Sequence, residues 1–225
     1  MMGISEIEAN LASPDPQARM RGLTALRDYE AEIAVPLLVS RRQDQEVIVR
    51  SLVAMGLGYK QNDKAFETLV GMLETEIHSN VRAEIANALI KYGKKAIPYI
   101  VPAFYQHPDW LMRMSILLAL ADMDSPQELF KLCLTAFVDP NPTVQETGVK
   151  CLGFLAGSDM EEDAVLHLLA FSQSQHWQIR QQVAIALRPF PDPRALETLL
   201  QLQQDPDYRV VSAVLEGIWS SRSAG

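Results

Sequence analysis

The side chains that could bind a metal or attack a substrate are few in this chain and lie far apart. A metal site on a helix typically needs two histidines four residues apart or a His-Glu pair, and neither pattern occurs. A glycine-rich phosphate loop and a Gly-x-Ser-x-Gly motif are also missing from the sequence. We therefore expect no catalytic residue, no metal site and no bound cofactor. The four histidines, of which the second and fourth fall in turns where an exposed ring is expected, are His78, His107, His167 and His176.

The two cysteines are too few for a disulfide framework and are typical of a protein from a reducing compartment. Cys133 stands among apolar residues, and Cys151 stands where other parts of the chain place alanine or glycine. Both are expected to be buried small side chains. The alternative, a thiol that contacts a bound group, would need an exposed sulfur with a lowered pKa.

A motif of about 32 residues, Asp-Pro-x-x-x-Val-Arg-x-x-Ala-x-x-Ala-Leu, recurs seven times along the chain. If the first residue of each copy is position 0, positions +5 and +9 are apolar or glycine, +12 is small, and +13 is long and aliphatic. These offsets share one face of a helix and could not share one side of a strand, whose side chains alternate. Position +6 is occupied in the seven copies by Arg19, Arg50, Arg82, Arg113, Gln145, Arg180 and Val211.

A second apolar-periodic segment precedes each of these helices, and about 32 residues accommodate two helices and two turns. Such a hairpin buries its apolar face only against neighbours, so the copies must stack. The pattern predicts an all-α fold, a right-handed α-solenoid of about seven helical hairpins that forms one domain over residues 1–225. The expected repeats are residues 4–29, 33–60, 63–92, 95–123, 126–155, 161–190 and 193–219.

The position +6 arginines are expected to form a ladder along this stack. An acidic residue at position 0, such as Asp44, Glu76 or Asp139, would cap the second helix, and the arginine would bridge to the acidic residue of its own or the adjacent repeat. The ladder should weaken at Gln145 and end at Val211.

This signature resembles the HEAT repeat, and the short period is similar to the compact HEAT-like repeats of the phycobilisome lyase group. The resemblance covers residues 4–219. It implies a binding surface on the second helices and a partner that is a protein, such as a phycobiliprotein or an assembly factor for cofactors or iron–sulfur clusters. It also implies a photosynthetic bacterium as the source. Ankyrin and tetratricopeptide signatures are missing from the sequence.

The charge balance argues against two other kinds of partner. Twenty basic and 28 acidic residues give a net charge of −8, and the sequence contains no basic block. This balance argues against sequence-independent binding to the phosphates of a nucleic acid, so we expect no nucleic-acid partner. No apolar run approaches the length that crosses a bilayer, and the first residues lack a secretion signal. We expect no membrane insertion and a cytoplasmic location.

Positions +4, +8 and +11 should face the concave, inner side of the solenoid, where repeats two and four are unusually apolar for a surface. The function expected is a non-catalytic scaffold or adaptor that binds a protein there. The alternative for these positions is that neighbouring helices bury them. The alternative function is a bilin lyase or lyase subunit, which would need a tetrapyrrole pocket with arginines, chiefly Arg21 and Arg209. The candidate partner-binding residues are Ile48, Leu52, Met55, Asn80, Glu84, Asn87, Trp110, Leu111, Met114 and Leu118.

Overall fold

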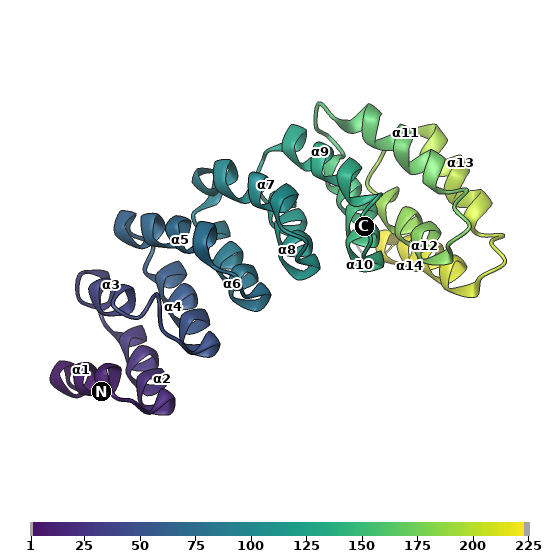
Figure 1. The fold of residues 1–225 in the computed structure, drawn as a ribbon. Helices are drawn as coiled ribbons and strands as arrows, with labels where there is room; N and C mark the ends of the chain where they lie inside the picture. Colours follow the sequence, from purple (N-terminus) through teal and green to yellow (C-terminus); the bar gives the residue numbers. More distant parts are fainter. Residues whose placement is uncertain (1, 223–225) are drawn as a thin grey trace. The chain divides into compact units, whose positions relative to one another are not determined.

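The computed structural model describes residues 2–222 of the chain, with side chains described up to Gly217. Over residues 2–222 the regular structure is helical and contains no strand (Figure 1). The chain divides into two compact units, residues 1–116 and 117–225, and the boundary falls inside helix α8. The all-α solenoid fold is confirmed. The expectation of a single domain stays a prediction.

In unit 1, helices alternate between a first and a second helix of each repeat. The second helices α2, α4 and α6 pack side by side, and the first helices α3 and α5 pack against each other in a separate layer. The elements are α1 (Ile4–Ala12), α2 (Pro16–Ala25), the 3-10 turn η1 (Leu26–Asp28), α3 (Ala31–Val39), α4 (Val47–Lys60), α5 (Asp63–Thr75), α6 (Ser79–Ile90), η2 (Gly93–Ala96), α7 (Ile97–Gln106) and the first part of α8 (Trp110–Ala121).

Unit 2 repeats the same arrangement. Its second helices α10, α12 and α14 pack side by side, and its first helices α11 and α13 pack together. After the end of α8 its elements are α9 (Pro126–Ala136), α10 (Pro142–Leu152), η3 (Gly153–Leu155), α11 (Glu161–Phe171), α12 (Trp177–Ala186), α13 (Pro193–Leu202) and α14 (Tyr208–Arg222).

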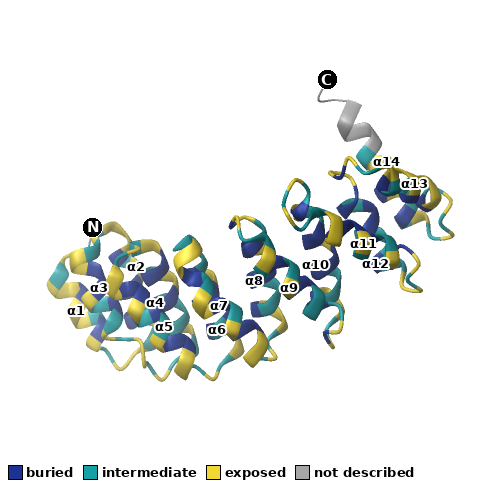
Figure 2. Cartoon of the chain, turned by 90° about the horizontal axis from the view of Figure 1, so that it is seen from above, coloured by how far each residue is buried: buried dark blue, intermediate teal, exposed yellow. Residues whose placement is uncertain are grey.

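The repeated apolar columns form the core, as the spacing predicts. Every position +5 and +9 residue is buried, and so is every described +13 residue. Figure 2 shows buried stretches, in dark blue, along the helices of both units. Ile218, the seventh +13 residue, lies outside the described side chains. The small +12 column has a direct cause at Ala88: a Cβ built on Gly58 of the preceding repeat would lie 2.7 Å from the Cβ of Ala88, so the two backbones approach too closely for larger residues.

The arginine ladder exists, and four of its arginines reach the acidic residue of the next repeat. Each ladder arginine also donates to the backbone carbonyl at position 0 of its own repeat, as Arg50 does to Asp44 at 2.8 Å. Gln145 keeps this bond to the Asp139 carbonyl at 2.6 Å. The ion pairs that cross between repeats are Arg19–Asp44 at 2.8 Å, Arg50–Glu76 at 2.7 Å, Arg82–Asp109 at 2.5 Å and Arg180–Asp205 at 2.6 Å.

The expectation that the position 0 acids cap the second helices is wrong. Asp44 lies three residues before α4, and its carboxylate accepts the backbone N–H of Glu46 at 3.0 Å. Asp139 accepts the N–H of Asn141 in the same way, at 2.8 Å, and Asn141 is the residue that caps α10. The acids therefore close the turn before the helix, an Asx-type turn, and the second oxygen of Asp44 lies 2.8 Å from Nε of Arg19 in the preceding repeat.

Candidate functional site

A row of apolar side chains runs along the exposed side of α4. Ile48 is 49% exposed, Leu52 is half-buried, Met55 is 37% exposed and Tyr59 is 69% exposed. Their spacing of four, three and four residues keeps them on one side of an α-helix. The core columns of the same helix, such as Val53, face the opposite way and are fully buried. The chain thus leaves one apolar side of α4 uncovered within unit 1.

A cavity of about 570 Å³ opens between α2 and α4 beside this row. Leu52 and Met55, two of the residues expected in a binding surface, lie in its wall. The sequence left open whether these positions form an exposed surface or are buried by neighbouring helices. Leu52 is half-buried, whereas Met55 is exposed. The lining residues are Leu23, Thr24, Leu26, Arg27, Leu38, Leu52, Met55, Gly56, Tyr59 and Lys60.

Positive side chains lie at the Tyr59 end of the row on α4 and on the neighbouring helix α2. Lys60 donates through Nζ to the carbonyl oxygens of Arg27 at 2.9 Å and of Tyr29, which holds it at the end of the cavity. Lys91 places its ammonium group 3.4 Å from the centroid of the Tyr59 ring, a cation–π contact. Arg21, on α2, exposes 58% of its side chain.

The expected polar residues of repeat three lie on α6, which packs beside α4. Asn80 and Asn87 are exposed and Glu84 is half-buried. Burial raises the pKa of the Glu84 carboxyl above its ordinary value, although the charge of Lys91 acts in the opposite direction. This residue therefore contributes less negative charge at mildly acidic pH than an ordinary surface glutamate.

The expected residues of repeat four lie on α8. Trp110 is 45% exposed, Leu111 is 37% exposed and Met114 is half-buried, and all three belong to unit 1. Leu118 is 36% exposed and belongs to unit 2. A single surface that joins repeats two to four stays a prediction.

Sequence reasoning missed Tyr59, Arg27 and Lys60. The predicted surface stops at position +11. One more turn of the same helix leads to position +15, which in repeat two is Tyr59. The two cations carry no periodic signal, because they lie near the C-terminal ends of α2 and α4 and meet only when these helices pack.

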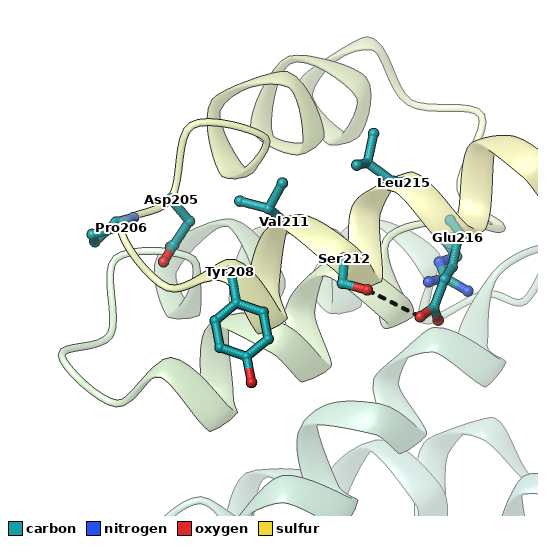
Figure 3. Close-up of a pocket in the computed structure, with 8 residues that line it drawn as sticks. Asp205, Pro206, Tyr208, Val211, Ser212, Leu215 and Glu216 are labelled. Carbon is teal, nitrogen blue, oxygen red and sulfur yellow. Dashed lines mark hydrogen bonds between the residues drawn. The ribbon is translucent and has the colours of Figure 1, made fainter.

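A cavity of about 870 Å³ in unit 2 also had no signal in the sequence. It is a wide, open hollow along α14, and Figure 3 shows the side chains of Tyr208, Val211, Ser212 and Leu215 along the helix that borders it. The carboxylate of Asp205 in its wall already accepts two hydrogen bonds from Arg180, at 2.6 and 2.8 Å. Its lining brings together no group of side chains suited to catalysis.

The cysteines are buried, as expected. Cys133 and Cys151 are both free thiols with no exposed surface. Burial raises the pKa of Cys151 to about 12 and that of Cys133 well above its ordinary value. The alternative of a reactive exposed thiol is therefore wrong for both residues, since a reactive thiol needs a lowered pKa.

The histidines are spread over both units. His107 ends α7 and is half-buried, so the expectation of an exposed ring is wrong there; burial and the charge of Arg82 lower its pKa. His176 precedes α12 and is exposed as expected. Within the part of the chain that the structure describes, no three His, Cys, Asp or Glu side chains form a group that could hold a metal ion. No helix among residues 2–222 combines the length and apolar character needed to cross a bilayer.

A family model of HEAT repeats matches residues 35–121 and 130–219, which is most of the chain. The chain is a HEAT-repeat protein. The match explains why the ladder and the small columns recur in both units, because each HEAT repeat must present the same two faces to its neighbours. A search among curated proteins found no match.

Several solved structures share the fold of this HEAT-repeat protein. The complex of CpcE and CpcF of phycocyanin lyase from Nostoc sp. PCC7120 is 19% identical with a TM-score of 0.55, over 98% of this chain and 95% of that chain. A mutant of Kap121p is 14% identical with a TM-score of 0.66, over 96% of this chain but 29% of that chain. An engineered protein is 19% identical with a TM-score of 0.55, over 94% of this chain and 67% of that chain. Similarity at these identities shows the fold alone.

Proposed function

We propose that this HEAT-repeat protein is a non-catalytic scaffold that binds another protein on the α2–α4 face of unit 1. The observation that carries the proposal is the open cavity of about 570 Å³ whose wall includes Leu52, Met55 and Tyr59. Contiguous exposed apolar surface on a soluble protein commonly marks an interaction site. Methionine and tyrosine suit such a site because one adapts its shape and the other adds a large ring with a polar tip.

The exposed apolar side chains of this face would contribute part of the binding energy. Completing the burial of a large, half-exposed apolar side chain contributes on the order of 1 kcal/mol, about half of the full value. Ile48, Met55 and Tyr59 are all at least 37% exposed. Because they project from helices already packed in the unit, little backbone entropy is lost when a partner binds.

The test uses a photo-crosslinking amino acid at Met55 and, as a matched control, at Ile33. Ile33 is 45% exposed and lies on the first helix α3, but it is not among the residues that line the cavity. In lysate of the source cell, a crosslinker at Met55 should capture one protein reproducibly, and the same position should lose that product when Ile48 is replaced by Asp. Capture of the same protein from Ile33, or no effect of I48D in a folded variant, would contradict the proposal.

The context in which the scaffold works is a finer proposal. The similarity of the repeat to the phycobilisome lyase group supports a phycobiliprotein or a cofactor assembly factor as the partner, in the cytoplasm of a photosynthetic bacterium. Identification of the crosslinked protein by mass spectrometry tests this directly. A partner with no link to pigment or cofactor assembly would remove the context and leave the scaffold role standing.

The second candidate, a bilin lyase subunit, is favoured by one observation and opposed by another. The cavity beside α4 holds Arg27 and Lys60, which could meet the two propionates of a bilin. Arg209, however, lies 3.3 Å from the Trp177 ring centroid and pairs with Asp207 at 2.7 Å, so its guanidinium is already engaged. Mixing the pure protein with a free bilin distinguishes the roles: a shifted visible band that R27A abolishes supports the lyase role, and an unchanged spectrum supports the scaffold.

A further inference from the structure

The second helices of unit 1 are almost free of acidic residues. The chain has 28 acidic residues, yet α2, α4 and α6 together contain one, Glu84. The first helix α5 alone contains Asp63, Glu67 and Glu74. Acidic residues are therefore distributed unevenly in this protein, and the helices beside the apolar row of α4 carry few of them.

The basic residues of the same helices fall into two groups. The charges of the ladder arginines Arg19 and Arg50 are neutralised inside the protein, because each arginine pairs with a largely buried carboxylate of the next repeat. Outside the ladder, Arg27 and Lys60 lie in the wall of the cavity, Lys91 lies against the Tyr59 ring, and Arg21 is an exposed residue of α2.

Carboxylates balance this second group only in part. Arg21 reaches Asp15 at 3.8 Å in a pair whose side chains are both more than half exposed, a geometry worth little. Arg27 and Lys60 line the cavity, and no carboxylate shares its wall. Outside the cavity wall, Asp28 and Glu30 are exposed acids beside this group, and Glu84 interacts with the charge of Lys91. The wall of the cavity thus carries two cations and no carboxylate, in a protein of net charge −8.

The shape of the row matches a helix. From Ile48 to Tyr59 the apolar side chains follow an i, i+4, i+7, i+11 pattern over about 16 Å at 1.5 Å per residue. The cavity lies between two packed helices, α2 and α4, where a third helix can place its own apolar side chains. An amphipathic helix laid into a groove is recognised through anchors at this same spacing.

We infer that the groove of α2 and α4 binds an amphipathic helix of the partner protein whose apolar stripe is bordered by Asp and Glu. The inference rests on the proposed function and adds the chemistry of the segment that is bound. The apolar row supplies contact area, and the cations Arg27 and Lys60 in the cavity wall select the sign of the flanking charge and its orientation.

Two synthetic peptides of about 15 residues test the inference, each with leucine at the i, i+4, i+7 and i+11 positions. One carries glutamate at the flanking positions and the other carries lysine. Titrated into the full-length protein and followed by fluorescence anisotropy, the glutamate peptide should bind about tenfold more tightly at low salt, and the preference should shrink at about 0.5 M NaCl. Equal binding of the two peptides, or a preference for lysine, would overturn the inference.

Variants connect the preference to the groove. R27E should reduce the preference for the glutamate peptide, while K64E, which removes an exposed cation from α5, should leave it unchanged. A preference that responds equally to both variants reflects net charge and contradicts the inference. If neither peptide binds while crosslinking at Met55 still captures a partner, the scaffold proposal stands and the helical acidic segment is wrong.

Discussion

The ladder pair Arg50–Glu76 gives the sharpest test of how this solenoid is held together. Arg50 Nε lies 2.7 Å from Glu76 Oε2 and its Nη2 lies 3.0 Å from Oε1, with side-chain exposures of 15% and 5%. R50M would remove the arginine donors from both carboxylate oxygens of Glu76 and from the Asp44 carbonyl. Removing one partner of a buried pair costs about 3–5 kcal/mol, and the lower end is expected because Glu76 keeps the N–H donors of Ile77 and His78.

The measurement is a double-mutant cycle of R50M, E76Q and the double variant, with free energies of unfolding from urea titrations followed by circular dichroism. The double variant should be more stable than the sum of the single effects predicts, with a coupling of about 2 kcal/mol. R21M is the matched control, since Arg21 belongs to an exposed pair, and it should change stability by less than about 0.5 kcal/mol. A coupling near zero, or equal losses for R50M and R21M, would refute a stabilising ladder.

The pH dependence of the same pair gives an independent readout. Burial pushes the pKa of Glu76 upward, but hydrogen bonds from Arg50 and from the N–H of His78, together with the arginine charge, hold it below the ordinary value of 4.5. A carboxyl whose pKa is lower in the folded than in the unfolded state stabilises the fold above the unfolded value, and this contribution disappears as the pH falls through the folded value. The free energy of unfolding of the wild type should therefore fall more steeply below about pH 4.5 than that of R50M. Identical pH slopes for the two proteins would exclude Glu76 as a source of the acid-dependent loss of stability.

Three further predictions concern packing, the gap in the ladder and the buried thiols. G58A should destabilise the protein by about 1–3 kcal/mol because its Cβ would meet Ala88. G71A, in open space on α5, should instead stabilise the protein by up to about 1 kcal/mol. Urea titrations of both variants measure these effects, and equal effects would contradict the close approach of Gly58 to Ala88. Ser174 already accepts the N–H of His176 at 3.2 Å as a position 0 residue, so Q145R combined with S174D should complete the ladder with a favourable coupling of about 1–3 kcal/mol, measured in a double-mutant cycle and refuted by an unfavourable one. Cys151 should react with a thiol reagent only in urea, and labelling in buffer at the rate of a free thiol would contradict its burial.

Much of the site could be anticipated from spacing alone. Positions +4, +8 and +11 of repeat two placed Leu52 and Met55 on the side of α4 away from the core, and the structure places both in the wall of a cavity. The helical period is sufficient for this prediction. Once the apolar core positions of a repeat are known, the remaining positions of the helix must lie on the side away from the core. Tyr59 would have followed from the same period extended by one turn.

Other parts of the site could not follow from the period of one helix. Whether Leu52 is half-buried and Met55 exposed depends on α2, which belongs to another repeat. Arg27 and Lys60 come together through a hydrogen bond between residues 33 positions apart. The sequence likewise left open whether each ladder arginine pairs within its own repeat, because both acids lie within reach of a long side chain.

The sequence by itself determined that this chain is a stack of helical hairpins, since four offsets on one helical face recur in seven copies and no other regular structure could bury them. It also determined where small residues and arginines stand. Only the tertiary structure decided that the arginines reach forward to the next repeat, that the acids close a turn instead of capping a helix, and that a groove opens between α2 and α4. The physical reason is that a period describes one helix, whereas exposure, ion pairing and cavities depend on the distances between helices, which packing sets.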